Sequence, residues 1–246
     1  MSLEHLPNYN LIHGDCYEII PTLEDKSIDL IVTDPPYEFQ KYGGGSLYKG
    51  TKRMETLYKL KDLDCWEFKP REFLDLIFPK MKIFNAYFFC NKMLIADYLN
   101  WSNEHDLKYD LLVMNKKNPV PAFKGHHLND LEYIILIREK GSYFDSKQPF
   151  DNYRKFFQIS CSGKRLHPAE KPVELLERFV NISCPEGKLV FDPFSGSGST
   201  GIACLKSGRN FLGCEKSEEY YELADKRLKD FEDSLNGVGG LFEGIE

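Results

Sequence analysis

Short apolar runs alternate with amphipathic stretches along most of the chain. Seven such runs are rich in Val, Ile, Leu and Phe, and turn-forming or charged residues follow most of them. Runs of this kind are typical of strands that are buried on both faces of a parallel sheet. The pattern therefore predicts strands at residues 10–13, 28–32, 83–89, 110–115, 131–137, 188–191 and 210–214.

Between these runs, apolar residues recur at helical spacing. In the stretch that opens at Pro70, for example, Phe73, Leu74 and Ile77 fall on one helical face. Strands that alternate with helices predict an α/β fold with a doubly wound, mostly parallel sheet. Helices are predicted from residue 69 and at residues 17–23, 92–103, 172–182, 200–207 and 217–233.

Two parts of the chain depart from this alternation. The runs at residues 110–115 and 131–137 follow each other with only a loop between them, so we expect an antiparallel hairpin at the edge of the sheet. Residues 143–165 show no clear periodicity and are predicted to be irregular. No internal repeat is evident, and residues 1–246 are interpreted as a single domain.

The composition is that of a soluble globular protein, because 42% of the 246 residues are hydrophobic and 28% are charged. No apolar stretch approaches the roughly 20 residues that span a bilayer, and the first residues lack the apolar core of a signal peptide. We therefore expect no membrane contact and a cytoplasmic location. The seven cysteines are scattered and include no C-x-x-C pair, so we expect mostly small buried residues rather than disulfides or a metal site.

The formal net charge of −6 argues against a uniformly basic nucleic-acid binder. The charge is unevenly distributed, however, because residues 215–246 alone hold ten acidic and four basic residues. Basic residues gather in three predicted loops, at residues 38–61, 116–127 and 147–165. The first loop directly follows a candidate site at residues 34–37, which would suit a cleft lined for phosphate groups.

The candidate site is the tetrapeptide Asp34-Pro35-Pro36-Tyr37, which follows the apolar run at residues 28–32. Two prolines cannot continue a strand ladder, so the backbone must leave the sheet there in a stiff conformation. In open α/β sheets, ligands bind at the carboxyl ends of strands. The motif would present a carboxylate, rigid carbonyl groups and an aromatic ring at such an end. Taken alone, the same four residues are equally compatible with a simple turn.

A second predicted strand end carries a glycine-rich loop. Asp192-Pro193-Phe194 is followed by Gly196, Gly198 and Gly201 in the spacing G-x-G-x-x-G, and Glu215 ends the next strand. This pattern would favour a dinucleotide site and an NAD-dependent oxidoreductase. A carboxylate before the first glycine, however, would repel a pyrophosphate and would suit a cofactor that carries an ammonium group.

The order of the motifs along the chain also argues against a dinucleotide fold. The chain after Gly196 supplies only one helix, one strand and one more helix, so the rest of the sheet must come from the N-terminal side. That is a circularly permuted order. Three motifs carry a resemblance to a known family: Asp34-Pro35-Pro36-Tyr37 comes before Asp192-Pro193-Phe194-x-Gly196-x-Gly198, and His167-Pro168-x-x-Lys171-Pro172 lies just upstream of the latter. In this order the chain resembles the beta-type (permuted) S-adenosylmethionine-dependent amino-methyltransferases of DNA, the N6-adenine/N4-cytosine family. The resemblance extends from Gly14 to Glu215, and it implies a class I methyltransferase (Rossmann-like) fold with seven strands and an antiparallel edge strand.

The resemblance implies a catalytic role for the tetrapeptide. Methyl transfer to an exocyclic amine needs alignment of the reacting atoms and no metal. The Asp34 carboxylate and the Pro35 carbonyl would accept hydrogen bonds from the two protons of the amine, and Tyr37 would stack on a base flipped out of the duplex. The candidate catalytic residues are Asp34, Pro35, Pro36 and Tyr37.

The resemblance also implies a site for S-adenosylmethionine. The glycine loop would hold the methionine part of the cofactor, with Asp192 near its ammonium group and Glu215 on its ribose hydroxyls. Asp15 would reach the adenine amine, although in isolation it fits a helix cap better. Lys171 would lie near the cofactor carboxylate, with a solvated lysine as the alternative. The candidate cofactor-binding residues are Asp15, Cys16, Asp34, Lys171, Asp192, Pro193, Phe194, Ser195, Gly196, Ser197, Gly198, Glu215 and Lys216.

The predicted function is methylation of adenine N6 in double-stranded DNA, because Asp rather than Ser opens the tetrapeptide. The alternatives are methylation of cytosine N4 and, more remotely, an NAD-dependent oxidoreductase or a non-catalytic DNA-binding partner. The base-reading interval of the family is short here, at residues 142–166, so the loop at residues 38–65 is expected to share the contact with DNA. The resemblance is compatible with a homodimer and with a companion restriction nuclease, neither of which the sequence itself indicates.

Overall fold

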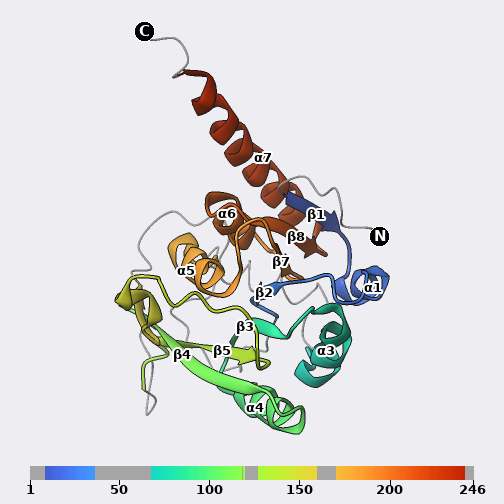
Figure 1. Ribbon diagram of the computed structural model, residues 1–246, viewed down its shortest axis with the longest axis vertical. Helices are drawn as coiled ribbons and strands as arrows, with labels where there is room; N and C mark the ends of the chain where they lie inside the picture. The colour runs from blue at the N-terminus through green and yellow to red at the C-terminus, as the bar shows by residue number, and fades with distance from the viewer. Residues whose placement is uncertain (1–8, 37–67, 118, 120–126, 160–169, 242–246) are drawn as a thin grey trace, which may run out of the picture.

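Figure 1 shows the computed structural model, which describes residues 9–36, 68–117, 119, 127–159 and 170–241. Within these ranges, eight strands form one sheet in the order β1-β8-β7-β2-β3-β5-β4-β6. The strands are β1 (Tyr9–His13), β2 (Leu30–Thr33), β3 (Asn85–Cys90), β4 (Lys108–Lys116), β5 (Leu131–Arg138), β6 (Phe156–Ile159), β7 (Leu189–Asp192) and β8 (Asn210–Glu215). The α-helices are α1 (Cys16–Ile19), α3 (Pro70–Ile77), α4 (Ile95–Glu104), α5 (Val173–Ser183), α6 (Ser199–Lys206) and α7 (Glu218–Leu241), and the short 3-10 helices are η1 (Ile20–Thr22), η3 (Phe78–Lys80) and η4 (Phe150–Tyr153).

The sheet is mostly parallel, as the apolar runs predict. Only β5 runs antiparallel to its neighbours, β3 and β4, among the strands that the structure describes. The central strands β2, β3 and β7 are buried at every residue. Their sequences are therefore near-continuous apolar runs, because both faces of the sheet are covered.

The permuted order is visible in the strand pairing. Strand β7, which leads into the glycine loop, pairs with β2 on one side and with β8 on the other, and β8 in turn pairs with β1. The C-terminal strands are thus enclosed between strands from the N-terminal part of the chain. This is the arrangement that the motif order predicts.

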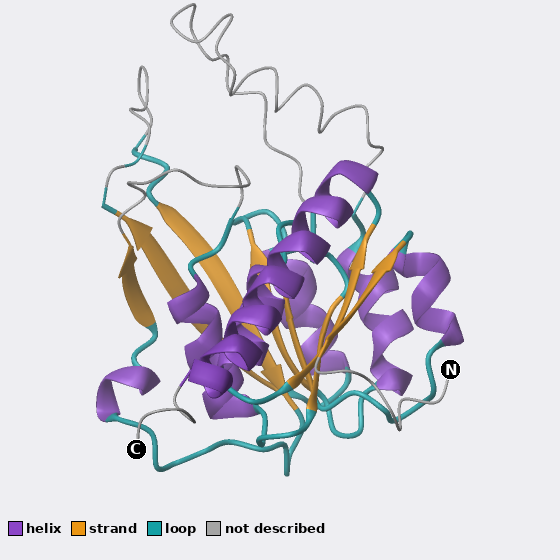
Figure 2. Ribbon diagram, turned by 90° about the horizontal axis from the view of Figure 1, so that it is seen from above, coloured by secondary structure: helices purple, strands orange, loops and turns teal. Residues whose placement is uncertain are grey.

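Helices cover both faces of the sheet (Figure 2). One apolar core lies between the sheet and α5, α6 and α7, and includes Leu30 and Val32 of β2. The other lies between the sheet and α1, α3 and α4, and includes Ile31 of the same strand. Successive residues of β2 therefore face opposite cores, which is the period of two that a strand imposes.

The number of strands and the edge of the sheet differ from the prediction. Eight strands are present within the described ranges, because residues 143–165, predicted to be irregular, contain β6. This strand has only four residues, too few for a periodic signal, and it forms by pairing with β4. The antiparallel hairpin of β4 and β5 forms as predicted, but β5 lies inside the sheet and β6 forms the edge.

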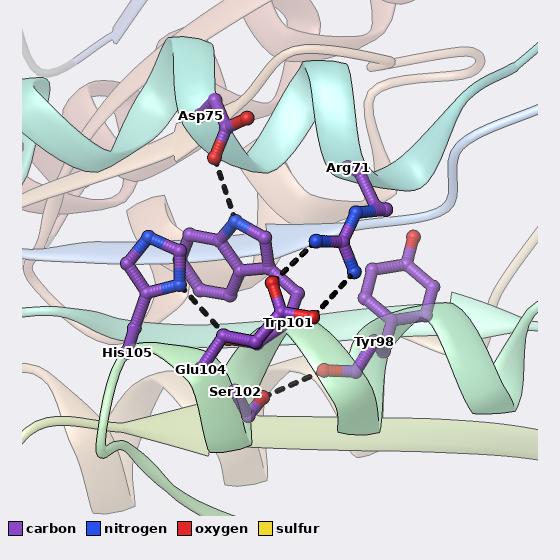
Figure 3. A network of polar contacts seen from close by, with 7 residues as sticks. All are labelled: Arg71, Asp75, Tyr98, Trp101, Ser102, Glu104 and His105. Carbon is purple, nitrogen blue, oxygen red and sulfur yellow. Dashed lines mark hydrogen bonds and ion pairs between the residues drawn. The ribbon is translucent and has the colours of Figure 1, made fainter.

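Helices α3 and α4 are joined by polar contacts around a buried tryptophan (Figure 3). Trp101 Nε1 donates a hydrogen bond of 2.7 Å to Asp75, and the His105 ring stacks on the Trp101 ring at a centroid distance of 4.1 Å. Arg71 forms an ion pair with Glu104 at the surface of the same helix pair. The buried indole N–H therefore has the partner that burial requires.

Burial of the five described cysteines agrees with the sequence-based expectation of small buried residues: Cys16, Cys90, Cys184, Cys204 and Cys214. Burial raises the pKa of each thiol. None of the helices within the described ranges has both the length and the apolar composition to cross a membrane. The last helix, α7, continues to Leu241 and is longer than the predicted 217–233.

Candidate active site

The candidate site residues lie where four neighbouring parallel strands end. Gly14 and Asp15 follow β1, Glu215 ends β8, Asp192 ends β7, and Asp34 follows β2. These strands are adjacent in the order β1-β8-β7-β2, so their carboxyl ends form one continuous edge. The structure thus brings together residues that are up to two hundred positions apart in the sequence.

Of the two carboxylate oxygens of Asp34, one has a charged partner and the other has no hydrogen-bond partner among the described residues. The Asp34 side chain is 20% exposed, and its Oδ2 forms an ion pair with Lys171. Its Oδ1 is buried and has no hydrogen-bond partner among the described residues. Burial raises the pKa of the Asp34 carboxyl, and the charge of Lys171 opposes this effect. A buried acceptor without a partner at a strand end is a place where a ligand donor would be stabilised.

The prolines that follow Asp34 keep the backbone out of the sheet, as predicted. Pro35 is buried and Pro36 is partly exposed, and neither is part of a strand. Tyr37 lies outside the described residues. The same is true of His167, Pro168 and the loop at residues 38–65, as well as the end of the interval at residues 142–166, so the predictions for these residues remain predictions.

Lys171 connects Asp34 to a second acid that the sequence analysis did not select. Its ammonium group lies 3.6 Å from Glu132 Oε2 and 5.0 Å from the centre of the Phe89 ring. Glu132 is also paired with Lys116, through its other oxygen. Burial pushes the pKa of Glu132 upward, but Lys171 and Lys116 hold it below its usual value. Lys171 is only 8% exposed, so it is not the solvated lysine considered as the alternative.

The glycine loop is held by backbone contacts to β8. Ser195 N donates to the Cys214 carbonyl at 2.9 Å, and Gly196 N donates to Glu215 Oε2 at 2.8 Å. Gly196 and Gly198 adopt positive φ angles of 51° and 75°, which side chains disfavour. Apart from Gly196 itself and its two neighbours in the chain, no atom of the described residues lies within 4 Å of the point where a Cβ on Gly196 would be, so this face of the loop is open.

The third glycine of the G-x-G-x-x-G pattern has a packing role. A Cβ on Gly201 would lie 2.6 Å from Leu228 Cδ2 and 2.9 Å from Phe211 Cδ1. Gly201 therefore allows α6 to pack closely against α7 and β8. This requirement accounts for the residue without a dinucleotide.

Arg227 of α7 supports the glycine loop from behind and was not expected from the sequence. Its Nη1 donates to the Ser197 carbonyl at 3.0 Å and lies 3.2 Å from Ser199 Oγ. Its Nη2 lies 2.8 Å from Glu170 Oε1, so the same guanidinium also holds the residue that precedes Lys171. One side chain thus joins the loop to the segment that carries Lys171.

Asp192 is buried and hydrogen-bonded at the start of the glycine loop. Its Oδ1 accepts hydrogen bonds from Thr33 Oγ1 at 2.7 Å and from Phe194 N at 3.1 Å. Burial raises the pKa of Asp192 to about 6 in spite of these bonds and one from Thr200. The residue thus fastens the start of the loop to β2.

Asp15 caps the helix that follows it, which is the alternative that its position in the sequence favours. Its Oδ1 accepts a hydrogen bond of 2.9 Å from Tyr17 N, and Lys216 Nζ lies 3.1 Å from its Oδ2. Glu215 accepts bonds from Gly196 N and from Ser217 N, each of 2.8 Å, and burial raises its pKa. The carboxylates of Asp15 and Glu215 therefore stand at neighbouring strand ends, beside the glycine loop.

Of three further candidates, Phe194 is partly exposed, whereas Pro193 and Cys16 are buried. The Phe194 ring packs against Phe73 and Phe68, with centroid distances of 5.4 and 5.8 Å. These contacts place a cluster of aromatic rings at the start of the glycine loop.

Comparisons with known proteins agree with this geometry. A family model described as DNA methylase, for enzymes of the N6/N4 type, matches residues 28–226. The chain belongs to the N6/N4 DNA methylase family. Among curated relatives, the type II methyltransferase M2.MboI of Moraxella bovis is 28% identical and covers 89% of this chain and 87% of its own. M.HinfI of Haemophilus influenzae is 27% identical and covers 93% and 70%.

Solved structures show the same fold. The M1.HpyAVI complex with S-adenosylmethionine has 26% identity and a TM-score of 0.66, covering 89% of the methylase described here and 99% of its own chain. The cytosine-N4-specific PvuII methyltransferase has 17% identity and a TM-score of 0.65, covering 94% and 95%. This methylase therefore has the class I methyltransferase fold and acts on DNA, which leaves no support for the dinucleotide interpretation of the glycine loop.

Proposed function

We propose that this DNA methylase transfers a methyl group from S-adenosylmethionine to the exocyclic N6 amine of adenine in double-stranded DNA. The observation that carries the proposal is the Asp34 carboxylate, whose buried Oδ1 lacks a hydrogen-bond partner among the described residues. Thr33, which directly precedes Asp34, is hydrogen-bonded to Asp192 at the start of the glycine loop. The site for the methyl donor and the site for the base that accepts the methyl group would thereby be fixed to one edge of the sheet.

The residues around the glycine loop fit S-adenosylmethionine. The open face at Gly196 provides room for close approach to the backbone, and the carboxylates of Glu215 and Asp15 can accept hydrogen bonds from hydroxyl and amine groups. The partly buried Phe194 ring can pack against an aromatic ring. When bound, S-adenosylmethionine supplies a methyl group on a positively charged sulfur, and this methyl passes to the amine nitrogen while the electron pair of the broken C–S bond stays on sulfur.

Asp34 would act on the amine rather than on the cofactor. The lone pair of an exocyclic amine is delocalised into the base, so the nitrogen is a weak nucleophile. Hydrogen bonds from its two protons to Asp34 Oδ1 and to the Pro35 carbonyl would favour a tetrahedral nitrogen with a localised lone pair. As the nitrogen gains positive charge, the Asp34 carboxylate stabilises it and accepts the proton that leaves. The raised pKa of Asp34 suits this proton transfer.

The base must leave the duplex to reach this edge, and we propose that Tyr37 stacks on it there. The DNA would be held by residues 38–65 and 142–166. In the described part of the second segment, Arg154 and Lys155 are each paired with an aspartate, Asp151 and Asp110. The curated relatives M2.MboI and M.HinfI are type II methyltransferases, and we propose that this chain belongs to a restriction–modification system with a companion nuclease.

Analysis of methylated nucleosides tests the assignment. Genomic DNA amplified in vitro carries no methylated bases and contains every short recognition site. After incubation with the protein and methyl-labelled S-adenosylmethionine, mass spectrometry of the nucleosides should find the label in N6-methyladenine. Label in N4-methylcytosine alone would overturn the choice of base, and unlabelled DNA would overturn the activity.

A further inference from the structure

Four charged side chains of alternating sign form a chain that ends at Asp34. Lys116 pairs with Glu132 Oε1, Lys171 lies 3.6 Å from Glu132 Oε2, and Lys171 is in direct contact with Asp34 Oδ2. All four are at most 27% exposed. Charges of both signs are balanced within this group, which is the condition under which such burial is tolerated.

The direction of β5 explains how Glu132 reaches this edge. In the parallel strands the last residues lie at the edge where ligands bind, whereas in the antiparallel β5 the first residues lie there. Glu132 is the second residue of β5 and pairs in register with Met114 near the end of β4. The antiparallel strand thereby delivers an acid to a row of ends that otherwise belongs to parallel strands.

Lys171 presents a difficulty for the proposed chemistry. Asp34 must be ionised and must direct its negative charge at a nitrogen that becomes positive. An ammonium group bonded to the same carboxylate cancels most of that field at short range. A second acid beside Lys171 reduces the conflict, because the negative charge of Glu132 offsets part of the Lys171 charge at Asp34. Lys116 pairs with the other oxygen of Glu132, but it acts on Asp34 less strongly than Glu132 does.

We propose that Glu132 is a positioning residue for Asp34: it balances the charge of Lys171 and takes over that ammonium group when the target amine binds to Asp34. The inference rests on the proposed function of Asp34. Glu132 Oε2 is buried and has no hydrogen-bond partner among the described residues, so it is an acceptor that a small movement of Lys171 would satisfy. Moving from 3.6 Å to a charge-assisted hydrogen bond of about 2.8 Å requires a shift of less than about 1 Å.

Lys116 keeps Glu132 available for this role. Because Lys116 holds the other oxygen of Glu132, the carboxylate stays ionised and oriented while its Oε2 faces Lys171. The Phe89 ring below the ammonium group limits the directions in which Lys171 can move. The arrangement thus offers Lys171 two acceptors, Asp34 and Glu132, on one short path.

Any pH effect on Asp34 depends on every ionisable group that acts on it electrostatically. Lys171 and Lys116 lower the pKa of Asp34, and Glu132 raises it. Asp34 in turn raises the pKa values of three groups on neighbouring elements, Cys90, Tyr98 and Asp192. The set contains two acids besides Asp34, namely Glu132 and Asp192, and Glu132 is the one that lies 3.6 Å from the ammonium group of Lys171.

The test is single-turnover methyl transfer to amplified genomic DNA by Glu132→Gln, with tritiated S-adenosylmethionine and a series of pH values. We expect a rate at least tenfold below that of the unaltered protein, while the Kd for S-adenosylmethionine, measured by calorimetry, changes less than threefold. Loss of a neighbouring negative charge lowers the pKa of Asp34, so the acid limb of the rate profile should move to lower pH. A rate within threefold of the unaltered protein, or a slow rate with an unmoved acid limb, would overturn the proposal.

Two further variants make the result specific. Glu132→Asp keeps the charge and withdraws it by one methylene group, so it should give an intermediate rate with an acid limb close to that of the unaltered protein. If Glu132→Gln does not fold, Glu132→Asp still tests the proposal. A rate for Glu132→Asp as low as that of Asp34→Ala would then contradict the proposal. Glu177→Gln, which removes a distant ion pair with Lys206, should leave the rate unchanged. Inactivity of the unaltered protein would defeat the proposed function, whereas an active protein matched by Glu132→Gln defeats only this inference.

Discussion

Thr33 Oγ1 donates a buried hydrogen bond of 2.7 Å to the carboxylate of Asp192. Thr33 directly precedes Asp34, and Asp192 begins the glycine loop, so this single bond joins the candidate base side of the site to the cofactor side. The two strands also pair in parallel at Leu30 with Val190 and at Ile31 with Phe191. Strand pairing and this side-chain bond together fix the separation of the two halves, which an in-line transfer requires.

Thr33→Val should weaken that connection without changing the shape of the side chain. The buried Asp192 carboxylate would lose one donor, so we expect the free energy of unfolding in urea to fall by about 1–2 kcal/mol. The single-turnover rate should fall by roughly tenfold, because misplacement by a fraction of an ångström is costly in such a transfer. Thr33→Ser keeps the hydroxyl and serves as the control. Equal rates for the Val and Ser variants would show that the hydrogen bond does not matter for positioning.

Asp192→Asn should change how stability depends on pH. The pKa of Asp192 is raised to about 6 in the folded protein, above the usual value of 3.8, so the folded state binds more protons than the unfolded state between these values. The contribution of Asp192 to stability is therefore fully present below pH 4 and is lost as the pH rises to about 6, at a cost of about 3 kcal/mol.

Urea denaturation of Asp192→Asn and of the unaltered protein at several pH values tests this assignment. The difference in unfolding free energy should shift in favour of Asp192→Asn as the pH rises from 4 to 7. The pH dependence of the difference is the test, since loss or gain of a hydrogen bond would offset it by a constant. A difference that does not vary with pH would contradict the assignment.

Arg227→Met should weaken cofactor binding through the glycine loop. The guanidinium bonds to Ser197 and Glu170 would be lost, so the loop and the Lys171 segment would no longer be held together. We expect the Kd for S-adenosylmethionine, measured by calorimetry, to rise roughly tenfold, which corresponds to about 1.4 kcal/mol. Lys229→Met, two residues further along α7 and exposed, should leave the Kd unchanged. Equal affinities for the two variants would exclude Arg227 as a support of the loop.

Much of the sheet edge could be predicted from the sequence because its parts carry local signals. Asp34-Pro35-Pro36 stops a buried strand by removing backbone donors, and Gly196 and Gly198 mark a loop with positive φ angles. The permuted order followed from the short chain after Gly196. Each of these inferences depends on residues that are close together in the sequence.

The rest of the site depends on pairings that leave no local signal. Glu132 interrupts an apolar run at its second residue, and only the reversed direction of β5 brings it to the active edge. Arg227 is one of several charged residues on α7, and its contact with Ser197 joins residues thirty positions apart. Strand β6 forms only because β4 offers it an edge. The hydrogen bond between Thr33 and Asp192 forms because the two residues end adjacent strands.

The central claim is that the Asp34 carboxylate accelerates methyl transfer to the amine. The most direct measurement is the single-turnover rate of Asp34→Asn with saturating S-adenosylmethionine and DNA, accompanied by calorimetry of cofactor binding. We predict a rate lower by about 10²- to 10³-fold, with the cofactor Kd within threefold of the unaltered protein, because a neutral amide cannot stabilise the developing charge or accept the proton. A rate within threefold of the unaltered protein would contradict the account.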